Sequence, residues 1–119
     1  MKCWSPIPTA MKTFALFAAL VLGAASSSLA ADHRIKVSDT EFTPRTVNAV
    51  AGDTITFVLV PGAMGHNLQS VTIPAGAEPW DTPLDPENPR FRIQVAVSGV
   101  YRHHCNVHLF MKGVIRVSE

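Results

Sequence analysis

Three side chains that can bind a soft metal ion stand at regular spacing near the C-terminus. They are Cys105, His108 and Met111, in the pattern C-x2-H-x2-M. A thiolate, an imidazole and a thioether are together a donor set that suits copper. A loop between one strand ending at Cys105 and another beginning near Lys112 can turn all three toward one point. A second imidazole would complete a trigonal site with methionine as the weak axial ligand, and His66, in a loop after a strong core strand, is its natural source.

These residues also have simpler explanations. A cysteine at the end of a strand is most often only buried, and a methionine in a loop usually serves packing. The joint occurrence of four such donors in one small chain favours a metal site over four separate structural roles. The neighbouring His103 and His104 do not extend it into a zinc site, because adjacent side chains of a strand point to opposite faces. A second metal site that uses one of them or His33 is the weaker hypothesis.

Residues 1–30 have the pattern of a secretory signal peptide. Lys12 precedes a strongly apolar segment over residues 14–25, and small residues follow that segment. At about 1.5 Å per residue the segment falls short of the roughly 30 Å of a bilayer's hydrocarbon core. We therefore expect cleavage after Ala30, with a retained membrane anchor as the alternative. Met11, followed by a lysine, reads as a natural start of translation.

Removal of the signal peptide leaves a single domain of 89 residues, 31–119. Lys2 and Lys12 are lost with it, so the 10 basic side chains become 8 against 9 acidic ones. This near balance argues against a protein that binds nucleic acid through its phosphates. Cys3 is lost as well, so the mature domain has Cys105 as its single thiol and forms no internal disulfide. A thiol in an oxidising compartment is then buried, catalytic or bound to a metal.

The mature chain shows the alternation of half-buried strands. Apolar side chains fall on one face of residues 34–38, of residues 54–60 and of residues 90–97, with a period of two. No stretch of ten or more residues has helical periodicity, and glycine-containing turns separate the strands. Five prolines within residues 73–89 predict a loop, with one helical turn near residues 77–80. The pattern is typical of an all-β fold, either an antiparallel sandwich or a small barrel.

Several segments carry a family pattern. Residues 42–57 match F-x-P-x-x-V-x-V-x-x-G-D-T-[IV]-x-F, with Ala49 in the place of the second valine. In this pattern and in its metal-ligand spacing the chain resembles the cupredoxins, the type 1 (blue) copper proteins of the plastocyanin/azurin-like family. The short C-x2-H-x2-M loop is similar to that of amicyanin, and the region after Gly65 is similar to pseudoazurin. The resemblance covers about residues 33–118 and implies a Greek-key sandwich or barrel of about seven to eight strands.

The resemblance implies a role for each matching residue. His66 and His108 would be the imidazole ligands of one copper ion that alternates between Cu(I) and Cu(II). Cys105 would supply the thiolate and Met111 the axial thioether. In the family, the asparagine that matches Asn67 ties the two ligand loops together and so holds the ligands in orientation.

These expectations define a small exported copper protein that carries single electrons between periplasmic redox partners. We expect no enzymatic activity, no membrane span in the mature chain, and a monomer. The alternative is a periplasmic copper-binding or delivery protein, although such proteins usually expose clusters of methionine and histidine, and Met64 is the only other methionine of the mature chain. A thiol enzyme that uses Cys105 is a third hypothesis, for which a small sandwich leaves little room.

The redox partners are not identified by the sequence. With a mature net charge near zero, long-range electrostatic steering is weak, so we expect docking through a small apolar patch. Met64, Leu109 and Phe110 are the expected rim of this patch. The alternative for Phe110 is a position in the core.

Overall fold

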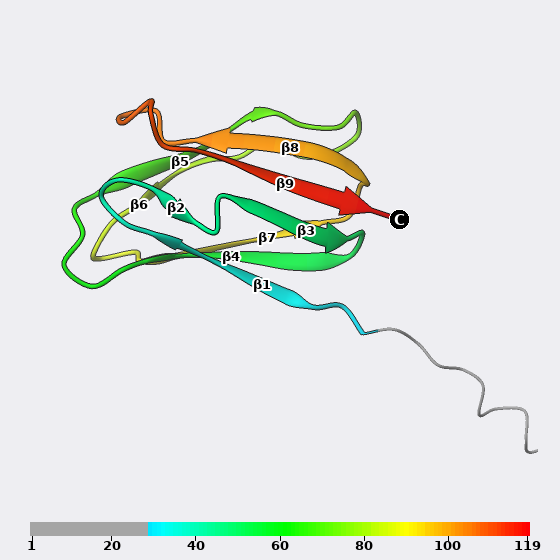
Figure 1. Ribbon diagram of the computed structural model, residues 1–119, viewed down its shortest axis with the longest axis horizontal. Helices are drawn as coiled ribbons and strands as arrows, with labels where there is room; N and C mark the ends of the chain where they lie inside the picture. Colours follow the sequence, from blue (N-terminus) through cyan, green and yellow to red (C-terminus); the bar gives the residue numbers. More distant parts are fainter. Residues whose placement is uncertain (1–28) are drawn as a thin grey trace, which may run out of the picture.

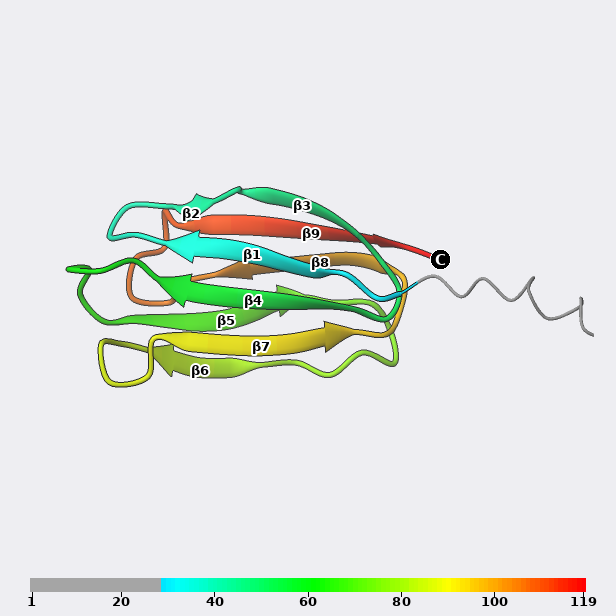
Figure 2. The same cartoon turned by 90° about the horizontal axis from the view of Figure 1, so that it is seen from below.

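The computed structural model describes residues 29–119, which form two β-sheets packed face to face (Figures 1 and 2). The first sheet has the strand order β2-β1-β4-β7 and the second the order β3-β9-β8-β5-β6. The described residues contain no helix, and the expected all-β sandwich is confirmed. The strands in chain order are β1 (Asp32–Val37), β2 (Phe42–Thr43), β3 (Thr46–Val50), β4 (Asp53–Leu59), β5 (His66–Thr72), β6 (Asp81–Leu84), β7 (Arg90–Val95), β8 (Gly99–His104) and β9 (Lys112–Ser118).

Two features of the sandwich differ from the sequence-based expectation. The proline-rich segment 73–89 is not a loop throughout, because Asp81–Leu84 forms β6, and its expected helical turn at residues 77–80 is absent. Proline is tolerated in β6 because this strand lies at the edge of its sheet, where one side needs no partner. With β6 and the two-residue β2, residues 29–119 contain nine strands, against the expected number of about seven to eight.

The sheets are also mixed rather than purely antiparallel. β1 pairs in parallel with β4, and β3 pairs in parallel with β9. Parallel neighbours need a crossover connection, and here the crossover from β1 to β4 passes through β3 in the opposite sheet (Figure 1). Alternation along the chain indicates which face of a strand is buried, but it does not indicate the direction of the strand's neighbours.

The inner faces of both sheets make one apolar core. The predicted inward face of β4 is confirmed, since Ile55 and Phe57 are fully buried. They pair with Ile93 and Phe91 of β7, which are partly buried. Further core residues from both sheets are Ile35, Val37, Phe42, Leu68, Leu84, Val95, Tyr101 and Ile115.

The two histidines of β8 lie on opposite faces, as predicted. His103 is buried, with its ring 4.7 Å from that of Phe42 and 5.2 Å from that of Phe57, measured between centroids. Burial lowers the pKa of His103 to about 4, so the ring is neutral at pH 7. His104 faces outward and its Nε2 lies 2.7 Å from Oε1 of Gln69.

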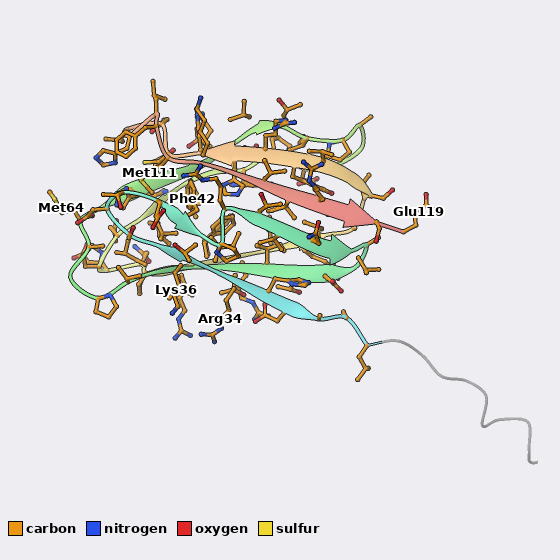
Figure 3. The ribbon with its side chains drawn as sticks, viewed as in Figure 1. Arg34, Lys36, Phe42, Met64, Met111 and Glu119 are labelled. Carbon is orange, nitrogen blue, oxygen red and sulfur yellow. The ribbon has the colours of Figure 1, made fainter. Side chains whose placement is uncertain are left out.

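The connections that follow β1, β4 and β8 lie at one end of the sandwich, together with Met64 and Met111 (Figure 3). The start of β1 and the end of β9 lie at the opposite end (Figure 1). Within residues 29–119, no helix is long and apolar enough to cross a membrane. The expected signal peptide lies outside the described residues, apart from residues 29 and 30.

Candidate metal centre

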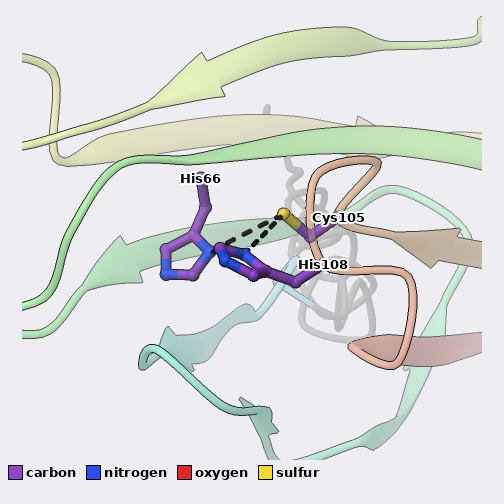
Figure 4. A group of neighbouring side chains, drawn as sticks. All are labelled: His66, Cys105 and His108. Atoms are coloured by element: carbon purple, nitrogen blue, oxygen red, sulfur yellow. Dashed lines mark hydrogen bonds between the residues drawn. The ribbon is translucent and has the colours of Figure 1, made fainter.

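Three of the predicted ligands meet at one end of the second sheet (Figure 4). His66 is the first residue of β5, not a loop residue as expected. Cys105 directly follows β8, and His108 lies in the loop between β8 and β9. β5 and β8 are antiparallel neighbours, so the start of β5 and the end of β8 fall side by side. The sheet pairing thus brings together residues that are 39 positions apart in the sequence.

The three donor atoms form a compact triangle. Sγ of Cys105 lies 3.6 Å from Nδ1 of His66 and 3.7 Å from Nδ1 of His108, and the two Nδ1 atoms are 3.1 Å apart. A point equidistant from the three atoms is about 2 Å from each, close to the length of metal–nitrogen and metal–sulfur bonds. Among residues 29–119, this is the one group of three or more histidine, cysteine, aspartate or glutamate side chains arranged to hold a metal ion.

The donor chemistry of this triangle fits copper. One thiolate and two imidazole nitrogens form the His2Cys set that, with a weak axial donor, is typical of trigonal copper sites. Cys105 is fully buried and His66 is 4% exposed, whereas the ring of His108 is partly exposed. His108 is therefore the member of the triangle that reaches the surface.

Met111 lies at the end of the same loop and is 1% exposed. Its backbone N–H donates to the carbonyl of His108 at 2.8 Å, and its own carbonyl accepts from the Cys105 N–H at 3.1 Å. These two hydrogen bonds close the ligand loop between β8 and β9. They hold three of the four predicted ligands in one short turn of backbone.

The carboxylate of Asp39 holds the ring of His66. Nε2 of His66 lies 3.1 Å from Oδ1 of Asp39, and the same oxygen accepts the N–H of Met64 at 2.8 Å. With the proton of His66 on Nε2 toward the carboxylate, Nδ1 presents its lone pair to the metal position. The Met64 N–H, and after it the His66 ring, lowers the pKa of Asp39, so the acceptor is ionised at neutral pH.

Asp39 was not among the residues singled out from the sequence. It lies in the loop between β1 and β2, 27 positions before His66, and no spacing pattern links the two. The available signal was weak: an acidic residue in a short polar turn of the chain. Only the packing of one sheet on the other brings it to the metal centre.

Asn67 contacts both sides of the site, but not through the contact that the resemblance implied. Its backbone N–H points to Sγ of Cys105 at 3.5 Å, and its side-chain Nδ2 donates to Asp81 at 2.9 Å. The link from β5 to the cysteine is thus made by the backbone, and the side chain binds the edge strand β6.

An apolar surface surrounds the exposed edge of the centre. Phe110 is 64% exposed, which excludes the alternative of a core position, and its ring centroid lies 5.8 Å from that of His108. Met64 and Leu109 are also largely exposed. Val107, 65% exposed, was missed in the sequence, although it lies in the same loop. We call these four residues, Met64, Val107, Leu109 and Phe110, the apolar patch.

The fold and the donor triangle define a small copper-binding β-sandwich protein. Residues 30–118 match the family model of copper-binding proteins of the plastocyanin/azurin family. The chain therefore belongs to the plastocyanin/azurin family of copper-binding proteins, and copper is its cofactor. A search among curated proteins gives no match.

Solved structures support the same assignment. A pseudoazurin from Sinorhizobium meliltoi is 29% identical with a TM-score of 0.64, and the alignment covers 75% of this chain and 75% of that one. Oxidised plastocyanin from Dryopteris crassirhizoma is 30% identical with a TM-score of 0.60, covering 71% of this chain and 99% of that one. A reduced amicyanin variant, 23% identical with a TM-score of 0.63 over 80% of this chain and 88% of that one, shares the fold.

Proposed function

We propose that this protein is a monomeric, exported carrier of single electrons between redox proteins. Its copper would be held by His66, Cys105 and His108, with Met111 as the axial ligand. The observation that carries the proposal is the triangle of three donor atoms, with sides of 3.1 to 3.7 Å, one of them a fully buried thiol sulfur. The buried thiol also argues against a thiol enzyme, because a substrate has no access to Cys105.

The protein's part in this function is to fix the ligands. Copper, when bound, supplies a one-electron couple between Cu(II) and Cu(I). The Asp39 carboxylate orients His66, the Asn67 N–H faces the Cys105 sulfur, and the loop hydrogen bonds hold His108 in place. Ligands that are held in this way cannot rearrange freely when the charge of the site changes. A small rearrangement is what rapid electron transfer requires.

The route for the electron to a partner is the ring of His108. Of the four proposed ligands it alone is more than marginally exposed, and the apolar patch lies in the same loop and in the neighbouring connection at Met64. An apolar surface suits brief contacts with more than one partner, because little polar surface must be desolvated on docking. We therefore assign docking of the electron donor and acceptor to this patch.

The direct test is copper loading of the purified protein. We expect one copper ion per chain and an intense blue colour that is lost on reduction and regained on oxidation. In Cys105→Ser the blue band is absent while the β-sheet signal in circular dichroism is kept. A colourless protein that binds copper and passes it rapidly to a chelator would instead support copper delivery. A full blue band in Cys105→Ser would refute the ligand assignment.

Export forms the second part of the proposal. We propose that residues 1–30 are a signal peptide, that cleavage follows Ala30, and that residues 31–119 are the mature periplasmic domain. The support is the short apolar segment with its small-residue end, together with a folded domain that begins at Asp32. The intact mass of the protein recovered from the periplasm tests this, and a mass that includes residues 14–25 would refute it.

A further inference from the structure

At the end of the sandwich remote from the metal centre, one buried carboxylate accepts hydrogen bonds from the start of the folded chain. Asp53, the first residue of β4, is 6% exposed. Its Oδ1 accepts the backbone N–H of Ala31 at 3.0 Å, and its Oδ2 accepts the N–H of Val50 and lies 2.9 Å from Nε2 of His33. The carbonyl of Ala31 is also bound, by the N–H of Thr54 at 2.9 Å.

Ala31 is therefore the first residue of the described chain that the fold holds by both its nitrogen and its oxygen. Leu29, two positions earlier, is 90% exposed, and Ala30 is exposed as well. The signal-peptide pattern places the cut at the Ala30–Ala31 bond, on the basis of small residues alone. Two independent observations thus select the same nitrogen atom, one as the new N-terminus and one as the partner of Asp53.

We propose that Asp53 is a binding site for the α-ammonium group that signal-peptide cleavage creates on Ala31. The inference rests on the processing proposed above. Hydrolysis by the signal peptidase adds one water to the Ala30–Ala31 bond: the Ala30 carbonyl carbon takes the hydroxyl, and the Ala31 nitrogen takes the hydrogen. The resulting amine binds a further proton at neutral pH, so an uncharged amide N–H in the precursor becomes a cation in the mature protein.

The surroundings of Asp53 suit this change. Hydrogen bonds lower the pKa of the Asp53 carboxyl to about 2, and the bond from the Ala31 N–H contributes most to this shift. The carboxylate is therefore ionised before and after cleavage. The titratable group that contacts Asp53 is His33 of β1, which lies against Oδ2. On its other side β4 pairs with β7, where the apolar Val95 lies opposite Asp53. The ionised carboxylate already makes a charge-assisted hydrogen bond to the Ala31 amide. Cleavage adds the Coulomb attraction of a cation at the same nitrogen, so it strengthens the contact that joins β1 to β4.

The contact therefore favours the mature form over the precursor. In the precursor, residue 31 is joined to residue 30 and cannot carry a charge. After cleavage the charge lies against the Asp53 carboxylate, and the pKa of the α-amino group rises above its ordinary value of about 8. By linkage, a rise of about one pKa unit corresponds to about a tenfold gain in the folding equilibrium constant at a pH below both pKa values.

The test compares two N-terminal forms of the copper(I)-loaded mature protein. The first begins at Ala31 and the second keeps Ala30 as one extra residue. Each form is also made with Asp53→Asn, which gives four proteins. We expect NMR titration to show an α-amino pKa about one unit higher in the form that begins at Ala31 than in its Asp53→Asn variant. Asp32→Asn removes a neighbouring carboxylate, whose Oδ1 accepts from Thr56, and serves as the control for a general effect of charge.

The extra residue gives an independent measurement. We expect it to lower the folding equilibrium constant about tenfold with Asp53 present and to have little effect in Asp53→Asn. Equal effects in both backgrounds, or an α-amino pKa that Asp53→Asn leaves unchanged, would overturn the proposal. The intact mass of the exported protein distinguishes a failure of the proposed processing from a failure of the proposed binding site alone. A start at a residue other than Ala31 overturns both the processing and the binding site. Copper binding is unaffected by either result.

Discussion

The carboxylate of Asp39 and the imidazole of His66 lie 3.1 Å apart, although Asp39 lies in a loop that joins two strands of the first sheet and His66 belongs to the second sheet. Asp39 follows β1 of the first sheet, and His66 opens β5 of the second. The hydrogen bond fixes which nitrogen of His66 faces Cys105, and it ties the metal centre to the connection between β1 and β2. Loss of this contact therefore acts on the metal through the ring of His66.

We expect Asp39→Ala to weaken copper binding by about 10- to 100-fold, the usual effect of losing a side chain that orients a metal-bound histidine. Asp39→Asn keeps an acceptor for Nε2 and should lose less. Glu41→Gln is the matched control, because it removes an exposed charge from the same loop without a side-chain contact to the site. Competition with a chelator, followed by the blue band, measures the affinity. Equal affinities for Asp39→Ala and Glu41→Gln would exclude the orienting role.

Met111→Leu should keep the blue colour and raise the reduction potential. The colour depends on the thiolate of Cys105, whereas the thioether is a weak donor whose loss disfavours Cu(II). Leucine fills nearly the same volume in this buried position, so the fold is retained. Redox titration followed at the blue band measures the potential, and an unchanged value would show that Met111 is not the axial ligand.

The strong local patterns of this chain were sufficient to predict the sandwich and the donor set. Alternation placed Ile55 and Phe57 inward, and C-x2-H-x2-M singled out the loop that carries Cys105 and His108. A donor set is visible in sequence because its chemistry depends on residue type and short spacing. The direction of strand pairing depends instead on where the chain crosses between sheets, so the parallel pairing of β1 with β4 was not predicted.

The contacts that support the site were harder to predict for the same reason. Asp39 acts on His66 through space, across 27 positions, and no property of its own segment distinguishes it from other acidic turn residues. Pro83 of β6 is the opposite case: proline normally indicates a loop, but an edge strand such as β6 leaves one side unpaired and accepts it.

Phe110→Asp should slow electron exchange without changing the visible spectrum. Its exposed ring lies beside His108, and a carboxylate there must be desolvated on docking. Removal of a central interface residue costs about 2 kcal/mol, or about 30-fold in rate. The self-exchange rate, measured by NMR line broadening between oxidised and reduced protein, needs no identified partner. Val71→Asp, at an exposed position near the end of β5, is the control, and equal rates for the two variants would remove Phe110 from the docking surface.

Gly113→Ala should destabilise the fold through His103. The two residues pair across β8 and β9, and a Cβ at Gly113 would lie 2.6 Å from Nε2 of the His103 ring. Overpacking of this kind costs about 1–3 kcal/mol, measurable as a lower free energy of unfolding in urea for the metal-free protein. In a His103→Ala background the same substitution should cost much less. A cost that is equal in both backgrounds would mean that the ring is not the obstacle.

The acid stability of the domain should depend on Asp53. The N–H of Ala31, and after it His33 and the N–H of Val50, lower the pKa of this carboxyl from 3.8 to about 2 in the folded protein. As the pH falls, the unfolded chain binds its proton first. The contribution of the carboxylate is therefore complete above about pH 4 and is lost as the pH falls toward about 2.

We expect the difference in unfolding free energy between the wild type and Asp53→Asn to shrink between about pH 4 and pH 2. Urea unfolding of the metal-free proteins measures it, because release of copper at low pH then makes no contribution. A difference that stays constant down to pH 2, or one that grows as the pH falls, would show that the hydrogen bonds to Asp53 do not stabilise its ionised form.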